Sequence, residues 1–421
     1  MSRTVLYLTW NSIGDPLVYS QVLGYLHGLV EKGWRFVLVT MEAGRSPEWL
    51  STQQERLRWI LDQNFGLPRV DWRPVVISGL GVRLGVPLKL WLIRRHVSAI
   101  LAAGPVSLIH ARSYLPAWVA SKAAGCAGIP WLFDTRGFWV DEKVYKGGLP
   151  AAGLRFKVLK EQERRLYAAA DGVVMLAEAG KNFLQRKKWL TDNVPVAVIP
   201  TCVDTARFHP GVPTADRRLL CVGSVGPGYL GQAVLRLFAT AQRVLPDYRC
   251  ELYTCSDSRL VDRLARQEGV DLGRVRVRAL PPERMPEVLS GGGVGVSFIR
   301  PHVSKLASCP TKVGEYLACG MPVLYNPGIG DMDQVLGDGS VAVRCDDFSP
   351  ATLENALRRA AALVDAPHTG RRCRALARSY FSLEKGVAAY DALYRRLLGR
   401  GGMVCPDSGV SLTGSRTEVV S

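Results

Sequence analysis

Short apolar runs alternate with amphipathic stretches along most of the chain. Buried β-strands are predicted at 5–9, 36–40, 75–77, 106–110, 131–133 and 173–176, and again at 219–222, 250–253, 275–277, 294–298, 323–325 and 341–343. Stretches with the spacing of amphipathic helices separate them. Apolar strands alternating with helices are typical of parallel sheets covered by helices on both faces. We therefore expect an α/β protein with two doubly wound, Rossmann-like domains.

The boundaries of these domains follow from breaks in the pattern. The first domain is predicted at 1–195, a Pro- and Gly-containing linker at 196–213 and the second domain at 214–372. A closing helix at 373–399 is long enough to return to the first domain. The polar tail at 400–421 is predicted to be disordered. Two such domains face each other across a cleft, and ligands bind where the carboxyl ends of the strands meet it.

Composition narrows the class of protein. Hydrophobic residues make up 48% of the chain and charged residues 22%, as in ordinary soluble proteins. The ten cysteines are scattered without metal-ligand spacing, so we expect no metal. The start of the chain has no signal-peptide pattern, and no apolar run is long enough to span a bilayer. Reduced thiols in a cytoplasmic protein, free or bound at the inner face of the membrane, are the expectation.

The net charge of +17 points to anionic partners, and the first 195 residues carry +11 of it. No basic stripe alternates with aromatic residues and no zinc-finger spacing occurs, which argues against nucleic acid. Phosphorylated substrates and an anionic membrane are the other candidates. The segment 85–96 combines an apolar face with Lys89, Arg94 and Arg95, so it could lie on a membrane surface. A helix packed against the core of an α/β domain is the alternative.

One short segment carries most of the candidate chemistry. Cys309-Pro-Thr-Lys-Val-Gly-Glu-Tyr-Leu-Ala-Cys-Gly320 reads as a loop, a short helix capped by Thr311 and a glycine stop before the next strand. A helix N-terminus attracts anions, and Lys312 adds a positive charge in the first turn. Glu315 lies one turn deeper. A phosphate and a hydroxyl-rich sugar would use both charges, whereas a surface Lys–Glu pair on a helix is the simpler alternative.

The order of several motifs resembles a known enzyme family. Gly14-Asp-Pro-Leu-Val-Tyr-Ser-Gln-Val-Leu-Gly24, Asp134-Thr-Arg-Gly-Phe-Trp-Val-Asp-Glu142, Ile199-Pro-Thr-Cys-Val-Asp204 and Ser297-Phe-Ile-Arg-Pro301 precede the Pro-Thr-Lys segment. Together they are similar to GT-B glycosyltransferases, specifically retaining family 4 and its bacterial polysaccharide-type subgroup. The resemblance covers about residues 4–395. It implies that Glu315 holds the ribose of a nucleotide donor and that the helix N-terminus faces the diphosphate.

Three departures from the family pattern stand out. Ala307 occupies a position where the family usually has a second glutamate, and Arg136-Gly137 replaces His-Gly after a first-domain strand. The stretch that begins Gly223-Ser224 lacks the usual arginine and lysine. We expect Arg300, Lys305 and Lys312 to take the place of these missing cations.

The candidate site follows from both arguments. Catalytic roles are predicted for Arg136, Arg300 and Lys305. Acceptor binding is predicted for His110 and Arg136. Donor binding is predicted for Gly14, Gly223, Ser224, Arg300, Lys305, Pro310, Thr311, Lys312 and Glu315. Structural alternatives are an Asp134–Arg136 ion pair, an interior histidine at His110 and a simple turn at Gly223.

These expectations describe an enzyme that moves a sugar from a nucleotide-diphosphate donor to a glycan, a lipid-linked or a small-molecule acceptor. The resemblance implies retention of configuration, with neither metal nor other cofactor. Two alternatives stay open. One is a non-catalytic protein of the same fold that binds sugar nucleotides or a membrane surface, which the departures favour. The other is a sugar-nucleotide epimerase, which needs acid/base groups in the cleft.

Overall fold

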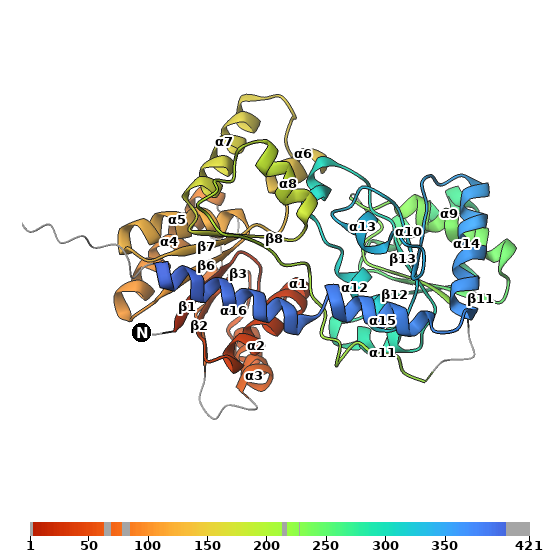
Figure 1. Ribbon diagram of the computed structural model, residues 1–421, viewed down its shortest axis with the longest axis horizontal. Helices are drawn as coiled ribbons and strands as arrows, with labels where there is room; N and C mark the ends of the chain where they lie inside the picture. The colour runs from red at the N-terminus through yellow and green to blue at the C-terminus, as the bar shows by residue number, and fades with distance from the viewer. Residues whose placement is uncertain (1–2, 63–68, 78–84, 213–216, 227, 401–421) are drawn as a thin grey trace, which may run out of the picture.

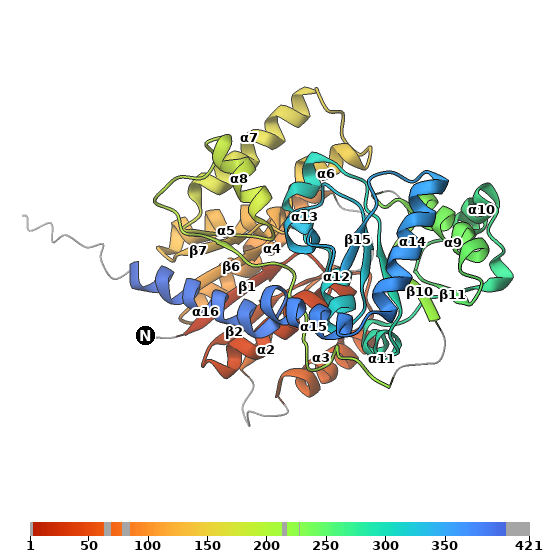
Figure 2. The same cartoon turned by 45° about the vertical axis from the view of Figure 1, so that its right-hand side comes forward.

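The computed structural model describes residues 3–62, 69–77, 85–212, 217–226 and 228–400. Two lobes lie side by side, each built on a parallel sheet with helices on both faces (Figures 1 and 2). The expected pair of doubly wound domains is therefore confirmed.

The first lobe contains a seven-stranded sheet in the order β4-β2-β1-β6-β7-β8-β9. Its strands are β1 Thr4–Thr9, β2 Arg35–Val39, β4 Val70–Trp72, β6 Leu108–Arg112, β7 Trp131–Asp134, β8 Gly172–Met175 and β9 Val196–Val198. A separate pair consists of β3 Met41–Ala43 and β5 Val75–Ile77. The helices are α1 Pro16–Val18, α2 Gly24–Glu31, α3 Pro47–Asp62, α4 Val86–Ala103, α5 Tyr114–Ala127, α6 Trp139–Tyr145, α7 Leu154–Ala169 and α8 Glu178–Arg186.

The second lobe contains a six-stranded sheet in the order β12-β11-β10-β13-β14-β15. Its strands are β10 Arg217–Val222, β11 Tyr248–Tyr253, β12 Val275–Arg278, β13 Val294–Ser297, β14 Val323–Tyr325 and β15 Ala342–Arg344. Its helices are α9 Gly231–Val244, α10 Ser258–Glu268, α11 Met285–Ser290, α12 Thr311–Ala318, α13 Met332–Leu336, α14 Pro350–Asp365 and α15 Thr369–Tyr380. The last helix, α16 Leu383–Arg400, follows α15 and returns to the first lobe.

Two predicted boundaries differ in the structure. Residues 196–198, assigned to the linker, form β9 and pair with β8 at the edge of the first sheet, where their apolar side chains pack. The single closing helix at 373–399 is two helices, α15 and α16. Between them Ser382 makes a β-bridge with Val203, which interrupts the helical hydrogen bonding. Of the predicted tail, Arg400 ends α16 and residues 401–421 lie outside the described part.

The helix α16 lies against α2 of the first lobe (Figure 1). Gly28 of α2 makes this close approach possible, because a Cβ at that position would come within 2.7 Å of Val387. Trp34 donates to the Asp391 carboxylate over 2.7 Å, and Tyr394 is buried in the first lobe's core. The end of the chain therefore completes the first domain.

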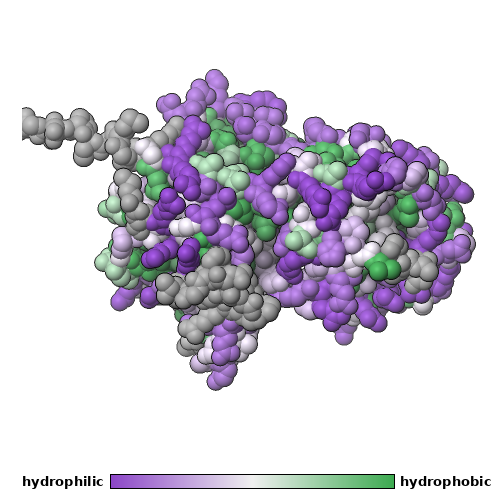
Figure 3. Space-filling view, turned by 60° about the horizontal axis from the view of Figure 1, so that its bottom comes forward, coloured by the Kyte–Doolittle hydropathy of each residue, from purple (hydrophilic) through white to green (hydrophobic). Residues whose placement is uncertain are grey.

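The segment 85–96 forms the start of α4. Ile93 and Val97 of this helix are buried in the core of the first lobe, as expected for a helix of an α/β domain. Leu88 and Trp91 are exposed on its outer side. Among the described residues, no helix is both long and apolar enough to cross a membrane. The face seen from below Figure 1 is mostly hydrophilic, with hydrophobic side chains in small groups (Figure 3).

A cross-domain helix cap joins the two lobes. The Asp331 carboxylate of the second lobe accepts from the backbone N–H groups of Glu178 and Ala179, over 2.7 and 2.8 Å, at the start of α8 in the first lobe. The Tyr380 hydroxyl donates to the same carboxylate over 3.0 Å. Carboxylates at a helix start satisfy unpaired N–H groups and interact well with the helix dipole.

The substitution Asp331→Ala is therefore expected to lower the unfolding free energy by about 2 kcal/mol. The measurement is the urea midpoint of the purified protein. Asp338→Ala is the matched control, since its carboxylate is exposed and accepts from Ser340 in the same loop. Equal losses in the two variants would contradict a cross-domain role for Asp331.

Candidate active site

A cavity of about 970 Å³ lies between the two lobes. Its walls include residues at the carboxyl ends of strands in both sheets, such as Arg112 at the end of β6, Gly223 after β10 and Thr254 after β11. This is the place where doubly wound folds bind ligands. Of the predicted residues, eight line it: Arg136, Gly223, Ser224, Lys305, Pro310, Thr311, Lys312 and Glu315.

The start of α12 points its positive end at this cavity. Pro310 holds the N-cap position with extended backbone, and the helix begins at Thr311. No side chain caps this end, so the predicted Thr311 cap is wrong. The Thr311 hydroxyl instead accepts from the Gln21 side chain of the first lobe over 2.9 Å. Uncapped N–H groups at a helix start are available to an anion.

Lys312 extends beside the loop that follows β10. Its Nζ lies 5.0 Å from the centroid of the Tyr229 ring and would be 3.2 Å from a Cβ at position 223. Gly223 also has a φ of +121°, which a residue with a side chain adopts only with strain. Glycine at 223 therefore allows both the turn and the approach of the ammonium group to the cavity.

Glu315 lies one turn deeper on the same helix and faces the cavity. Its carboxylate accepts no hydrogen bond from any other described residue. Burial raises the pKa of Glu315 to about 7, while the nearby charges of Lys312 and Arg207 act in the opposite direction. An unpaired carboxylate in such a wall is suited to accept hydrogen bonds from the hydroxyls of a ligand.

The other predicted cations differ in their positions. Lys305 lines the cavity, with its Nζ 3.5 Å from the Glu142 carboxylate of the first lobe. Burial alone would raise the pKa of Glu142, but Lys305 and Lys146 lower it below its usual value. Arg300 is exposed and does not line the cavity. Lys312 and Lys305 are thus better placed than Arg300 to meet a ligand.

Ser224 and Gly14 occupy the edges of the site. Ser224 is exposed in the loop after β10, where its hydroxyl accepts from the Gly226 N–H over 3.0 Å and lies 3.3 Å from the Ser256 hydroxyl. Gly14 is also exposed, but it packs next to Trp49 and does not line the cavity. Its place in the structure thus gives no direct contact with a ligand in this cavity.

The alanine at position 307 is fully buried between the lobes. A Cβ at Gly180 of α8 would come within 2.8 Å of the Ala307 Cα and Cβ atoms. A longer side chain at 307 would therefore separate the second lobe from α8. The departure from the family pattern at Ala307 has a packing reason.

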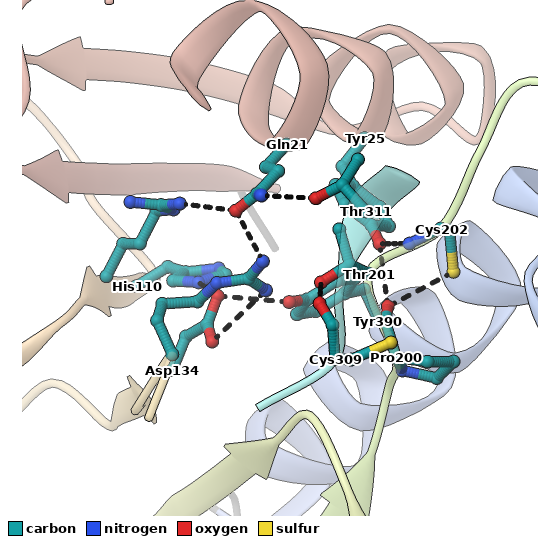
Figure 4. A network of polar contacts seen from close by, with 12 residues as sticks. Gln21, Tyr25, His110, Asp134, Pro200, Thr201, Cys202, Cys309, Thr311 and Tyr390 are labelled. Atoms are coloured by element: carbon teal, nitrogen blue, oxygen red, sulfur yellow. Dashed lines mark hydrogen bonds and ion pairs between the residues drawn. The ribbon is translucent and has the colours of Figure 1, made fainter. Parts of the chain in front are cut away.

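A polar network forms the first-lobe wall (Figure 4). His110 is buried, with its Nδ1 2.6 Å from the Tyr394 hydroxyl and its Nε2 3.5 Å from the Asp134 carboxylate. The Tyr390 hydroxyl donates to the same carboxylate over 3.1 Å. Burial lowers the pKa of His110, so it is neutral at pH 7. His110 lies behind the wall and is the satisfied interior histidine of the structural alternative.

Arg136 lines the cavity directly in front of this network. Its Nη1 lies 3.7 Å from Asp134, and its Nη2 donates to the Gln21 side chain over 2.7 Å. The residue has a φ of +56°, a strained backbone conformation that favours a functional role. Burial raises the pKa of Asp134, but the charges of Arg136 and Arg112 and the neighbouring His110 side chain lower it, and the lowering is larger.

Two residues of this wall were not singled out from the sequence. Gln21 lies in the π-helical turn Tyr19–Leu23, a local widening that is frequent at functional sites. Arg112 ends β6, two residues after His110, and donates to the Gln21 side chain over 2.8 Å. The signal for Arg112 was its position at the carboxyl end of an apolar strand. For Gln21, the only signal was its position within the segment Gly14–Gly24, which resembles a family motif.

Among the described residues, no group of three or more His, Cys, Asp and Glu side chains could hold a metal ion. On the second lobe, the cavity wall presents a helix N-terminus, a lysine and a carboxylate. On the first lobe it presents two arginines and a glutamine, and Lys305 of the second lobe pairs with Glu142 of the first.

Nearly half of the chain matches a known protein family. Residues 19–202 match the family model described as a glycosyl transferase 4-like domain. A search of curated protein sequences gives no significant match.

Similar solved structures share the whole fold at low sequence identity. Sucrose-phosphate synthase from Thermosynechococcus elongatus is 18% identical with a TM-score of 0.69, covering 94% of this chain and 100% of that one. HepE from Anabaena, in complex with UDP and glucose, is 13% identical with a TM-score of 0.65 over 94% and 100%. A putative UDP-N-acetylglucosamine 2-epimerase from Listeria monocytogenes is 13% identical with a TM-score of 0.58 over 94% and 98%.

The structural neighbours establish the fold, and the family model adds the class of enzyme. Both agree with the order of motifs in the sequence. The chain is a glycosyltransferase with the GT-B fold, and residues 19–202 match the model of the glycosyl transferase 4-like domain.

Proposed function

We propose that this enzyme transfers a sugar from a nucleotide-diphosphate donor to an acceptor in bacterial surface polysaccharide or glycolipid assembly. The observation that carries the donor assignment is the wall of the second lobe, where Glu315 has an unpaired carboxylate one turn below Lys312. The carboxylate accepts from the ribose hydroxyls, and the helix N-terminus and Lys312 bind the diphosphate. Similar structures contain UDP or UDP-glucose, which supports this class of donor.

The proposed mechanism requires stabilisation of the leaving diphosphate. Negative charge grows on the diphosphate as the bond to the sugar breaks. Fixed cations and backbone N–H groups aimed at that charge lower the barrier without a metal. Lys312 and the start of α12 supply these groups, with Lys305 nearby. Retention of configuration and the absence of a cofactor are part of the proposal.

The acceptor side of the proposal is the first lobe. Its surplus of positive charge suits an acceptor held at an anionic membrane, on the cytoplasmic side. The outer side of α4 supports this placement, because Leu88 and Trp91 are exposed beside Arg94 and Arg95. Arg95 also lies over the Trp91 ring, 5.7 Å from its centroid. Such a combination of aromatic and basic groups is typical of membrane-surface helices.

The first experiment is a thermal-shift screen with UDP, GDP, ADP, CDP and dTDP and their glucose conjugates. We expect one nucleotide to raise the melting temperature selectively, since binding to the folded state alone stabilises it. Release of that nucleotide from its sugar conjugate, with acceptor extracts present, then tests transfer. A well-folded sample that responds to no nucleotide would contradict the donor assignment.

The same assay separates the two alternatives. A non-catalytic protein would bind the nucleotide without releasing it from the sugar conjugate. An epimerase would change the sugar in the absence of any acceptor. The putative epimerase among the similar structures has the same fold, so the fold alone does not decide between these activities.

A further inference from the structure

Two buried guanidinium groups meet on the first-lobe wall of the cavity. Arg112 ends β6 and Arg136 follows β7, and these strands are neighbours in register, with Arg112 opposite Asp134. Arg112 and Arg136 both donate to the same atom, the Gln21 Oε1, over 2.8 and 2.7 Å. Figure 4 shows the Gln21 side chain next to Thr311, to whose hydroxyl it donates. Two positively charged side chains therefore share one uncharged acceptor atom.

The charges at this point do not balance. Arg112 and Arg136 carry two positive charges, and their described neighbours include one carboxylate, Asp134. His110 is neutral, and burial raises the pKa of the nearby hydroxyl of Tyr390 far above 7. Arg112 is 4% exposed, and the Arg136 side chain is 7% exposed. A buried charge without a partner is costly, so this wall lacks one negative charge.

Several guanidinium N–H groups also lack a hydrogen-bond acceptor. Arg112 Nε and Arg136 Nε are buried without a partner among the described residues, and Arg136 Nη1 has its ion pair to Asp134 at 3.7 Å. The Gln21 oxygen occupies the place where an anionic oxygen would satisfy both side chains. A carboxamide oxygen accepts their hydrogen bonds but brings no charge. An anion that enters from the cavity would displace Gln21 and supply the missing charge.

We propose that Arg112 and Arg136 form a binding site for a phosphate group of the acceptor, with Gln21 as the group that the phosphate displaces. The acceptor is therefore an anionic molecule, either a sugar phosphate or a lipid phosphate. This inference rests on the proposed transferase function. The donor groups Lys312 and Glu315 belong to the second lobe and the arginine pair to the first, so we assign the arginine pair to the acceptor. Guanidinium groups match the geometry of phosphate oxygens.

Gln21 joins the two walls in the absence of a ligand. Its Nε2 donates to the Thr311 hydroxyl at the start of α12 over 2.9 Å, while its Oε1 accepts from the arginines. A phosphate in the arginine site would lie close to the helix N-terminus that is proposed to hold the donor diphosphate. The displaced side chain of Gln21 then leaves Thr311 free for the donor.

The test titrates inorganic phosphate at constant ionic strength and follows the melting temperature, with and without a saturating amount of the nucleotide that stabilises the protein best. Wild type is expected to respond to phosphate in both conditions. The response should weaken about tenfold in Arg112→Gln and in Gln21→Glu, because the first removes a donor and the second supplies an internal negative charge. Nucleotide affinity should stay within about threefold in Arg112→Gln. Gln21→Glu should also raise the melting temperature of the ligand-free protein.

A matched control is Arg218→Gln, which removes a buried guanidinium of the second lobe that pairs with Glu251. It should leave the phosphate response unchanged. A hexose phosphate and a long-chain alkyl phosphate in micelles separate the two acceptor sources. The acceptor class is given by the probe that competes with inorganic phosphate for the arginine pair. This competition should occur in wild type and be lost in Arg112→Gln.

Three results would overturn the proposal. One is a wild type that does not respond to phosphate. The second is a phosphate-dependent rise in melting temperature that is as large in Gln21→Glu as in wild type. This result is decisive even if Arg112→Gln fails to fold. The third is an equal loss of nucleotide and phosphate affinity in Arg112→Gln, since the arginines would then belong to the donor diphosphate. Failure of every nucleotide to bind would reject the proposed function instead, while the phosphate titration alone would still report on the arginine site.

Discussion

Replacing Glu315 with glutamine is expected to raise the melting temperature of the ligand-free protein at about pH 8 and to weaken nucleotide binding by a factor of about 10 to 100. The two effects have different origins. Burial raises the pKa of Glu315 to about 7, so the folded state disfavours its charge. Glutamine removes that charge. It also removes the anionic acceptor that the ribose hydroxyls require, and hydrogen bonds to charged groups are the stronger ones.

The direction of the pH dependence follows from the same shift. The ordinary pKa of a glutamate is 4.5, and that of Glu315 is about 7 in the folded protein. The wild type therefore loses stability relative to Glu315→Gln as the pH rises from about 4.5 to 7, and the difference is constant above that. Nucleotide binding to the ionised carboxylate strengthens over about pH 6 to 8. Melting curves and nucleotide titrations across this range measure both.

Glu142→Gln provides a control with the opposite sign. Glu142 lines the same cavity, but Lys305 and Lys146 lower its pKa, so its charge stabilises the folded state. Its substitution should lower the melting temperature at neutral pH. A lower melting temperature and unchanged nucleotide affinity in Glu315→Gln would assign Glu315 a structural role.

Lys312→Ala is expected to reduce kcat/KM by a factor of about 100 to 1000, the range measured when one group that stabilises developing charge is removed. Lys312 lies in the first turn of α12 and reaches the loop after β10. Lys305→Ala should have a smaller effect, because Lys305 also pairs with Glu142. Arg300→Ala is the matched control and should stay within about twofold of wild type, since Arg300 is exposed outside the cavity.

Steady-state rates with the donor identified in the thermal-shift screen give this order of effects. A loss of activity in Arg300→Ala as large as that in Lys312→Ala would mean that the loop after β13 brings the Arg300 side chain into the cavity when the donor binds. A drop in affinity alone for Lys312→Ala, with kcat unchanged, would mean that Lys312 binds ground state and transition state equally.

The fold could be predicted from the sequence because its signal is local. Runs such as 5–8 and 219–222 are apolar throughout, which is what a strand buried on both faces requires. The predictions that were wrong concern segments whose structure depends on contacts with residues far away in the sequence. Residues 196–198 form a strand since β8 offers an open edge, and the closing helix breaks at Ser382 because Val203 pairs there. Neither partner is near in sequence.

The residues of the site also fall into those with a local sequence signal and those without one. Lys312 and Glu315 were recognisable since a helix start, a lysine and a carboxylate lie within seven residues of one another. Gln21 and Arg112 are 91 residues apart, and Gln21 contacts Thr311 across 290 residues, so no local pattern joins them. His110 and Arg300 share the residue types of binding groups, but burial and exposure were not readable from their neighbours. His110 is covered by Tyr394, and Arg300 is exposed outside the cavity.

The position of α16 bears on how the protein is made. Val387, Tyr390, Leu393, Tyr394 and Leu397 of this helix belong to the core of the first domain. The ribosome completes them after the entire second domain. Domains generally fold in the order of their synthesis, but this core has to wait for the final helix. A nascent first domain therefore exposes the apolar face of α2 throughout translation of the second, and a chaperone that covers α2 during that interval would raise the yield of folded enzyme.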